Sequence, residues 1–422
     1  MKNNSKFNVL LASALLSVTL WSGNLSKAVA QEDRIPHLDL EMTGREYSEL
    51  LKASGPFNKI RFNEFAAIIE MGKRNLGWID HMNKYRDEAN KLSLSSAATQ
   101  MAYPVETPRT YNPTIIHAQF EELKTLLPAE IKRVLLENVA FTQNPPLEEA
   151  AFLEWGRKVD RVYGIAVRWT TLKPYLFQLT LRKKQDIRGY YLLTRETDIQ
   201  QKLTHFHHQD AVTQTRLKPL LLNLCENSSG DNCVSELNIA INQQRVVGFY
   251  TRYLPIAKRI YDNYFIIPVR RHDVVWNSCA PDVMRVPFTN PNSEVVKKFL
   301  IDNLEDEWKL GSWNMRLDFT LENAYSPFIR FEQNVTPNVN GLAGNQITMN
   351  AAEPLTEYNV KWTIRHEFGH VLGLPDCYVE FYDRSVETMI SYQIDTTNLM
   401  CSRRGHLKDV HVSELMRVYY KK

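Results

Sequence analysis

The sequence has no surplus of either charge once its first 30 residues are set aside. The whole chain of 422 residues carries 51 basic and 48 acidic residues. Three of the lysines, Lys2, Lys6 and Lys27, lie in residues 1–30, which contain no acidic residue, so the remainder has 48 of each sign. This balance gives no reason to expect a nucleic-acid partner or binding to an anionic membrane surface.

Long apolar runs are absent after residue 30, so no later bilayer-spanning helix and no stable membrane insertion are expected. The early run, Val9 to Trp21, follows two lysines and precedes the small residues of Ala28-Val29-Ala30. This order predicts a secretory signal cleaved after Ala30, and hence a secreted or periplasmic protein. An uncleaved anchor is the alternative, but the run is shorter than the roughly 20 residues of a spanning helix. Residues 1–30 contain no cysteine, which excludes a lipid anchor through that side chain.

Cysteine is scarce, and the sequence has no internal repeat or low-complexity tract. In a secreted chain, five cysteines favour disulfides over metal or redox motifs. Cys225 and Cys233 flank the turn-rich loop E-N-S-S-G-D-N, which a bridge between them would close.

Residues 31–265 are predicted to form a mostly α-helical N-terminal region, because apolar residues recur there at helical spacing. The stretch 187–194 fits either a strand or a buried turn of helix. Residues 93–113, with a serine/alanine cluster and three prolines, predict a linker or an exposed loop. The helices are expected at residues 43–51, 62–92, 115–127, 129–141, 147–183, 197–225 and 234–264.

Residues 266–422 change character, so the whole chain is predicted to be an α+β protein with a second domain there. Asn292 or Ser293 is suited to cap a helix that runs to about Trp308. A helix from near Thr356 and a final helix near 408–420 follow. Strands are expected at residues 266–269, 274–276, 283–287, 315–320, 328–331 and 347–350.

The strongest chemical signal in the sequence is His366-Glu367-Phe368-Gly369-His370. On a helix, residues four apart lie on one face, so the imidazoles of His366 and His370 can reach one metal ion. Glu367 is rotated away from the histidines and can contact a water on the metal instead. A catalytic zinc takes three protein ligands and keeps one position open for that water.

A third ligand is available a short distance beyond the two histidines. Gly373 can take the positive φ that ends the helix, and Asp376 then brings a carboxylate. The pattern H-E-x-x-H-x-x-G-x-x-D therefore predicts one zinc ion held by His366, His370 and Asp376. Asp383 and His406 are less well spaced competitors for the third position.

The region after the metal motif contains Asp395-Thr396-Thr397-Asn398-Leu399-Met400-Cys401, followed by the predicted last helix. Together with the H-E-x-x-H motif it resembles the metzincin metallopeptidases, with Met400 in their methionine turn. The aspartate ligand resembles the snapalysin-type branch. The resemblance covers about the last third of the chain. No tyrosine follows Met400 at two residues, unlike the astacin- and serralysin-like members, so an oxyanion role at that position is not expected.

The resemblance implies a zinc-dependent endopeptidase acting on a protein or peptide substrate. A zinc-bound water would be the nucleophile and Glu367 the general base that passes a proton to the leaving amine. It also implies an edge strand that pairs with extended substrate, for which residues 347–350 are the candidate, and a disulfide between Cys377 and Cys401. Residues 378–382 and 389–392 would then form a hydrophobic substrate pocket or simply fill the core.

Several alternatives remain open at this stage. The protein could hold zinc as an extracellular binding protein with little turnover, or hydrolyse a non-protein amide such as cell-wall peptide. The N-terminal region could be a pro-segment that blocks the cleft or a docking domain. His205 to His208 could bind a second metal but fit a polar helix end better. Cys279 could latch the zinc, although a buried free thiol is the commoner state of an unpaired cysteine.

Overall fold

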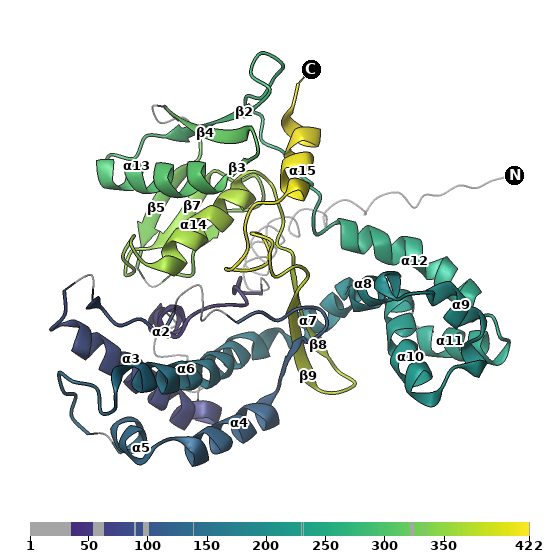
Figure 1. Cartoon of the computed structure of the whole chain (residues 1–422), viewed down its shortest axis with the longest axis horizontal. Coiled ribbons are helices and arrows are strands. Elements are labelled where there is room, and N and C mark those ends of the chain that lie inside the picture. The colour runs from purple at the N-terminus through teal and green to yellow at the C-terminus, as the bar shows by residue number, and fades with distance from the viewer. Residues whose placement is uncertain are drawn as a thin grey trace, which may run out of the picture. The chain divides into compact units, whose positions relative to one another are not determined.

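The computed structural model describes residues 35–53, 63–87, 90–95, 101–137, 139–228, 230, 232–320, 325–333 and 335–421. The expected signal at 1–30 lies outside these residues. The chain divides into Met1–Pro36 and the compact unit His37–Lys422, and the second unit is the one described below. It combines helices with small sheets (Figure 1). No helix in the described ranges has the length and apolar character needed to cross a membrane.

The first part of the unit is helical, as its periodicity predicts. Asn112 caps α4 by accepting a hydrogen bond from the backbone N–H of Ile115 at 2.9 Å, and a proline begins that helix. The elements are α2 (Gly44–Ala53), η2 (Asn63–Phe65), α3 (Ala66–Asn83), α4 (Pro113–Leu126), α5 (Ala129–Leu136), α6 (Glu149–Leu172), η5 (Lys173–Tyr175), α7 (Leu176–Leu181) and η6 (Arg182–Gln185).

Helix α3 is shorter than the helix predicted over residues 62–92. Its last residue is Asn83, whose side-chain amide donates to the carbonyl of Leu92 at 2.9 Å and accepts from the Leu92 backbone N–H at 2.8 Å. These side-chain bonds close a turn that competes with continued helix, a preference that asparagine shows generally.

The next helices surround a separate apolar core. Residues 187–194, for which strand and helix were both open, lie mostly in helix α8. The expected bridge between Cys225 and Cys233 is present and joins the end of α10 to the start of α11. The elements are α8 (Arg188–Arg195), α9 (Ile199–Thr204), η7 (Phe206–His208), α10 (Ala211–Glu226), α11 (Cys233–Asn242) and α12 (Val246–Asp262).

The C-terminal part mixes strands and helices around the largest core. Strands β2 and β4 pair in parallel, as do β5 and β7. Ser293 caps α13, which continues through the π-helical turn η8. The elements are β2 (Val283–Thr289), α13 (Glu294–Leu300), η8 (Ile301–Glu305), β3 (Lys309–Leu310), β4 (Trp313–Thr320), β5 (Phe328–Glu332), β6 (Asn338–Val339), β7 (Gln346–Asn350), α14 (Tyr358–Val371), β8 (Tyr378–Asp383), β9 (Thr388–Gln393) and α15 (Asp409–Tyr419).

The strands predicted at 266–269 and 274–276 do not form. In the first stretch the backbone N–H of Ile267 donates to the Glu414 carboxylate at 2.6 Å instead of to a neighbouring strand. In the second, Val275 makes only an isolated bridge to Arg285. Apolar β-branched residues favour strands, but here tertiary partners satisfy the backbone and override that propensity.

The edge-strand prediction for residues 347–350 is wrong. Strand β7 is the middle strand of its sheet, in the order β5-β7-β6, and the antiparallel strand β6 lies on its outer side. Helix α14 packs against both β6 and β7. The edge nearest the metal-motif helix therefore belongs to β6.

A third sheet joins the two halves of the chain. Strands β8 and β9 form an antiparallel hairpin, and β1 (Arg109–Tyr111) from the helical region pairs with β9. The stretch 93–113 is therefore not an exposed loop along its described length, since Val105 and Tyr111 are buried. On helix α6, Arg168 is fully buried and pairs with Glu380 of β8 at 2.6 Å.

Candidate metal centre

Helix α14 carries the H-E-x-x-H motif and ends where the sequence predicts. Gly373 has a φ of +89°, and its N–H donates to the His370 carbonyl at 2.9 Å. A side chain at this position would also be excluded sterically, since a Cβ would lie 2.3 Å from the Val269 carbonyl oxygen. The turn sends the chain back toward the helix and so delivers Asp376.

His366, His370 and Asp376 converge on one point. The two Nε2 atoms are 3.1 Å apart, and Asp376 Oδ1 lies 3.1 Å from Nε2 of His366 and 3.3 Å from Nε2 of His370. Both histidines are buried. Among the described residues, these three form the one group of His, Cys, Asp or Glu placed to hold a metal ion.

The tautomers of the two histidines follow from their outer hydrogen bonds. Nδ1 of His366 contacts the Leu399 carbonyl at 3.1 Å, and Nδ1 of His370 contacts the Leu374 carbonyl at 2.8 Å. Each Nδ1 must therefore carry a proton, which leaves the lone pair on Nε2. When both rings are neutral, two such lone pairs and a carboxylate oxygen face one another, which is a donor set that could hold a cation.

The spacing of the three atoms suits a small tetrahedral ion. Ligands at about 2.0–2.1 Å from a tetrahedral zinc lie about 3.3 Å from each other. The observed separations are 3.1, 3.1 and 3.3 Å. The donor set of two imidazoles and one carboxylate also matches a catalytic zinc site, so the residues present fit this metal.

The carboxylate of Asp376 shifts the pKa of the neighbouring imidazole of His370. Burial lowers the pKa of His370, but the adjacent Asp376 carboxylate outweighs burial and raises it to about 9. Burial alone would raise the pKa of Asp376. The charge of His370 and the hydrogen bonds from His366 and His370 outweigh burial and hold that pKa well below its usual value. The two shifts describe an ion pair between a protonated His370 and an ionised Asp376.

Glu367 and Tyr378 place two further polar groups near the three ligand atoms. Glu367 is buried, and its Oε2 atom has no hydrogen-bond partner among the described residues. Tyr378 follows Asp376 by two residues, and its buried hydroxyl also has no partner there. Burial raises the pKa of Tyr378 well above its usual value, and the charges of Asp376, Asp39 and Glu367 add to this. Unpaired buried polar atoms are costly, so both are candidates to bind something in the site.

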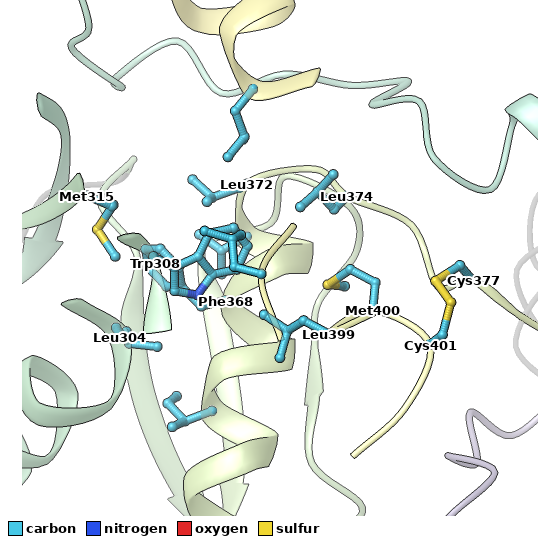
Figure 2. Close-up of a cluster of buried hydrophobic side chains, with 14 of the residues drawn as sticks. Leu304, Trp308, Met315, Phe368, Leu372, Leu374, Cys377, Leu399, Met400 and Cys401 are labelled. Atoms are coloured by element: carbon cyan, nitrogen blue, oxygen red, sulfur yellow. A yellow bond between two sulfur atoms is a disulfide. The ribbon is translucent and has the colours of Figure 1, made fainter. Parts of the chain in front are cut away.

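Met400 packs against the helix that carries the H-E-x-x-H motif. A Cβ added at Gly369 would lie 2.3 Å from Met400 Sδ, so the glycine lets the sulfur approach the helix backbone. Figure 2 shows Met400 beside the disulfide of Cys377 and Cys401, which the resemblance implied. The disulfide ties the chain just after Asp376 to the chain just after Met400.

Within residues 378–382 and 389–392, one set of side chains belongs to the core. The side chains of Val379, Phe381, Met389, Ile390 and Tyr392 are all buried. On the other face of β8, Glu380 pairs with Arg168 and accepts a hydrogen bond from the Tyr111 hydroxyl at 2.6 Å.

No family model, curated protein or solved structure matches this chain.

The other candidates from the sequence lie outside the three-residue group. Asp383 bonds Ser385 and pairs with Lys183, and His406 is exposed beside Glu307. Cys279 is a free thiol as expected, but it is exposed rather than buried. His205 to His208 form a short helical turn, in which Nε2 of His207 contacts a backbone carbonyl.

Sequence reasoning missed the residues that surround the site from the helical region. His37 lies with its ring edge-on to His370, 6.4 Å between ring centres. Arg403, just past the methionine turn, is buried and pairs with Asp39 and Glu46. Arg403 lies close in sequence to the metal motif, and a buried arginine needs an acidic partner. The sequence does not show that this partner would be Asp39 or Glu46.

Proposed function

We propose that this protein is a secreted zinc-dependent endopeptidase that hydrolyses peptide bonds with Glu367 as the general base. The observation that carries the proposal is the convergence of His366 Nε2, His370 Nε2 and Asp376 Oδ1 near the buried Glu367, whose Oε2 atom has no hydrogen-bond partner among the described residues. A purely structural ion pair would need only Asp376 and one histidine, so it would explain neither the second histidine nor the buried Glu367.

The chemistry assigns a task to each side chain. When bound, zinc supplies an acidified water and polarises the carbonyl to be attacked. Glu367 takes the proton of the attacking water and passes it to the departing amine. The hydroxyl of Tyr378 is a donor for the negative charge that develops on the substrate oxygen. The backbone carbonyls behind His366 and His370 hold the imidazoles in the tautomer that can bind a metal.

The order of elements supports a metzincin-like arrangement for residues 266–422. Strand β2, helix α13, strands β4 and β5, the short antiparallel edge β6, strand β7 and helix α14 follow one another. A methionine turn and helix α15 complete the order that the resemblance implies. With β6 as the edge, Asn338–Val339 is where extended substrate would pair.

The N-terminal stretch of the compact unit lies against the site, which favours a masking role over a docking domain. His37 is beside His370, and Arg168 donates to the carbonyls of Leu38 at 3.0 Å and Asp39 at 2.6 Å. Substrate would have to displace this stretch, so cleavage activity should rise after limited proteolysis.

Two alternative functions can be distinguished from an endopeptidase by assay. An extracellular zinc-holding protein would bind metal without turnover, and a cell-wall amidase would cleave only a non-protein amide. The buried Glu367 favours hydrolysis, because a binding protein has no use for an unpaired carboxylate there.

The deciding experiment compares the mature protein with its Glu367→Gln variant. Zinc is quantified in both, and casein-type and cell-wall peptide substrates are assayed before and after limited proteolysis, with and without a chelator. We expect one zinc in each protein, chelator-sensitive casein cleavage by the wild type, and loss of at least 10² in kcat in the variant, the scale of general acid–base catalysis.

A matched control is Glu357→Gln, which changes a glutamate at the start of the same helix. It should leave cleavage unchanged. Equal activity in Glu367→Gln and wild type would contradict the mechanism, and cleavage that survives complete zinc removal would contradict the enzyme class.

A further inference from the structure

The indole of Trp362 stacks on the imidazole of His366. The ring centres are 4.8 Å apart and the ring planes are inclined by 28°. The two residues are one helical turn apart on α14, so the contact is built into a single rigid element. Both side chains are buried. Among the described residues, the ring contacts of His370 are edge-on, at 89° to His366 and 86° to His37.

Trp362 is in turn covered by a buried guanidinium. The Arg403 Cζ atom lies 5.7 Å from the centre of the Trp362 ring, within the range of a cation–π contact. The indole N–H has no hydrogen-bond partner among the described residues, so stacking rather than hydrogen bonding holds the ring.

Arg403 is fixed by acids that lie more than 350 residues away in the sequence. Its guanidinium makes a two-pronged contact with Glu46 at 2.6 and 2.9 Å and donates to Asp39 at 2.7 Å. Its backbone N–H donates to Glu41 at 2.6 Å. The planar guanidinium, bonded to Asp39 and Glu46, cannot rotate away from the indole without breaking several charged hydrogen bonds.

We propose that Trp362 is a positioning residue that fixes the His366 ring for metal binding, and that Arg403, held by Asp39, Glu41 and Glu46, keeps Trp362 in place. This rests on the metal site of the proposed function. The outer hydrogen bond to Leu399 fixes one direction of the imidazole, and the stack fixes the plane of the ring. Loss of such supporting contacts typically weakens metal binding by about 10–100-fold.

The test measures zinc affinity of the purified full chain by competition with a chromophoric chelator, after removal of bound metal. We expect Trp362→Leu to bind zinc at least about tenfold more weakly than wild type. Trp362→Phe keeps an aromatic face and should retain most of the affinity. Arg403→Lys keeps the charge but loses the planar fork, and should show an intermediate loss.

The matched controls are Trp308→Leu and Trp308→Phe. Trp308 is also fully buried, and its indole N–H has no hydrogen-bond partner among the described residues. Its ring packs on Phe368 of α14, with 5.9 Å between ring centres, and not on a proposed metal ligand. Urea unfolding of the metal-free variants should show comparable losses of stability at both positions. The zinc affinity of the Trp308 variants should stay close to wild type.

A spectroscopic measurement serves if Trp362→Leu does not fold. Zinc titrated into metal-free wild type should change the emission of Trp362, and this change should persist in Trp308→Phe and vanish in Trp362→Phe. Wild-type zinc affinity in Trp362→Leu, or an unaltered emission change in Trp362→Phe, would overturn the assignment. Wild-type protein that binds no zinc would instead overturn the metal site itself.

Discussion

Removal of the Cys377–Cys401 disulfide should weaken both the fold and the metal site. The bridge closes a sequence separation of 24 residues, and the Cys225–Cys233 bridge closes one of 8. The chain-entropy relation for these separations gives about 3.5 and about 2.5 kcal/mol at 25 °C. The first bridge is therefore expected to contribute about 1 kcal/mol more to the free energy of unfolding.

The two disulfides differ more in the parts of the structure that they connect than in their contribution to stability. Cys377 follows the proposed ligand Asp376 directly, and Cys401 follows Met400, which packs against Gly369. Cys225 and Cys233 belong to a different core. Double serine variants of each pair should both lose stability, but only the Cys377/Cys401 variant should also bind zinc more weakly.

The assay combines urea unfolding with chelator competition on both double variants. Cys225→Ser/Cys233→Ser serves as the control for the general effect of losing a disulfide. Equal zinc affinities in the two double variants would refute the claim that the bridge positions Asp376. A larger stability loss for the Cys225/Cys233 pair would refute the entropic estimate.

Two further predictions concern burial near the site. Burial, with Asp39 nearby, raises the pKa of Glu41 from 4.5 to about 7, so between these values the folded chain holds a proton that the unfolded chain has lost. The free energy of unfolding should then fall by up to about 3 kcal/mol as pH rises from 4.5 to 7, and Glu41→Gln should remove that slope in urea titrations. Gly369→Ala should lower the free energy of unfolding by about 1–2 kcal/mol, because the new methyl group overpacks against Met400 while alanine's higher helix propensity offsets part of the loss. If the loss were the same in a Met400→Ala background, the two residues would not be in contact.

The local parts of the site could be predicted from the sequence because they depend on short spacings. The helical period places His366 above His370, Gly373 permits the reversal, and Asp376 arrives three residues later. The Ser293 cap and the closing helix follow from similarly local rules. Whether the three side chains hold zinc in solution remains a prediction.

The remaining features depend on pairings between distant parts of the chain. Strand β1 pairs with β9, and Arg403 pairs with Glu46, across gaps of more than 270 residues. Hydrophobic periodicity carries no information about which acid a buried arginine will meet. The edge strand was misassigned because β6 has only two residues, Asn338 and Val339, too few to show alternation.

The central claim is tested most directly by metal analysis of the purified mature protein and its His370→Ala variant, with X-ray absorption to identify the ligands. We predict one zinc per chain with two nitrogen ligands and one carboxylate oxygen, and loss of that zinc in the variant. Protein that is folded and active without zinc, or a variant that keeps the wild-type zinc content, would contradict the account.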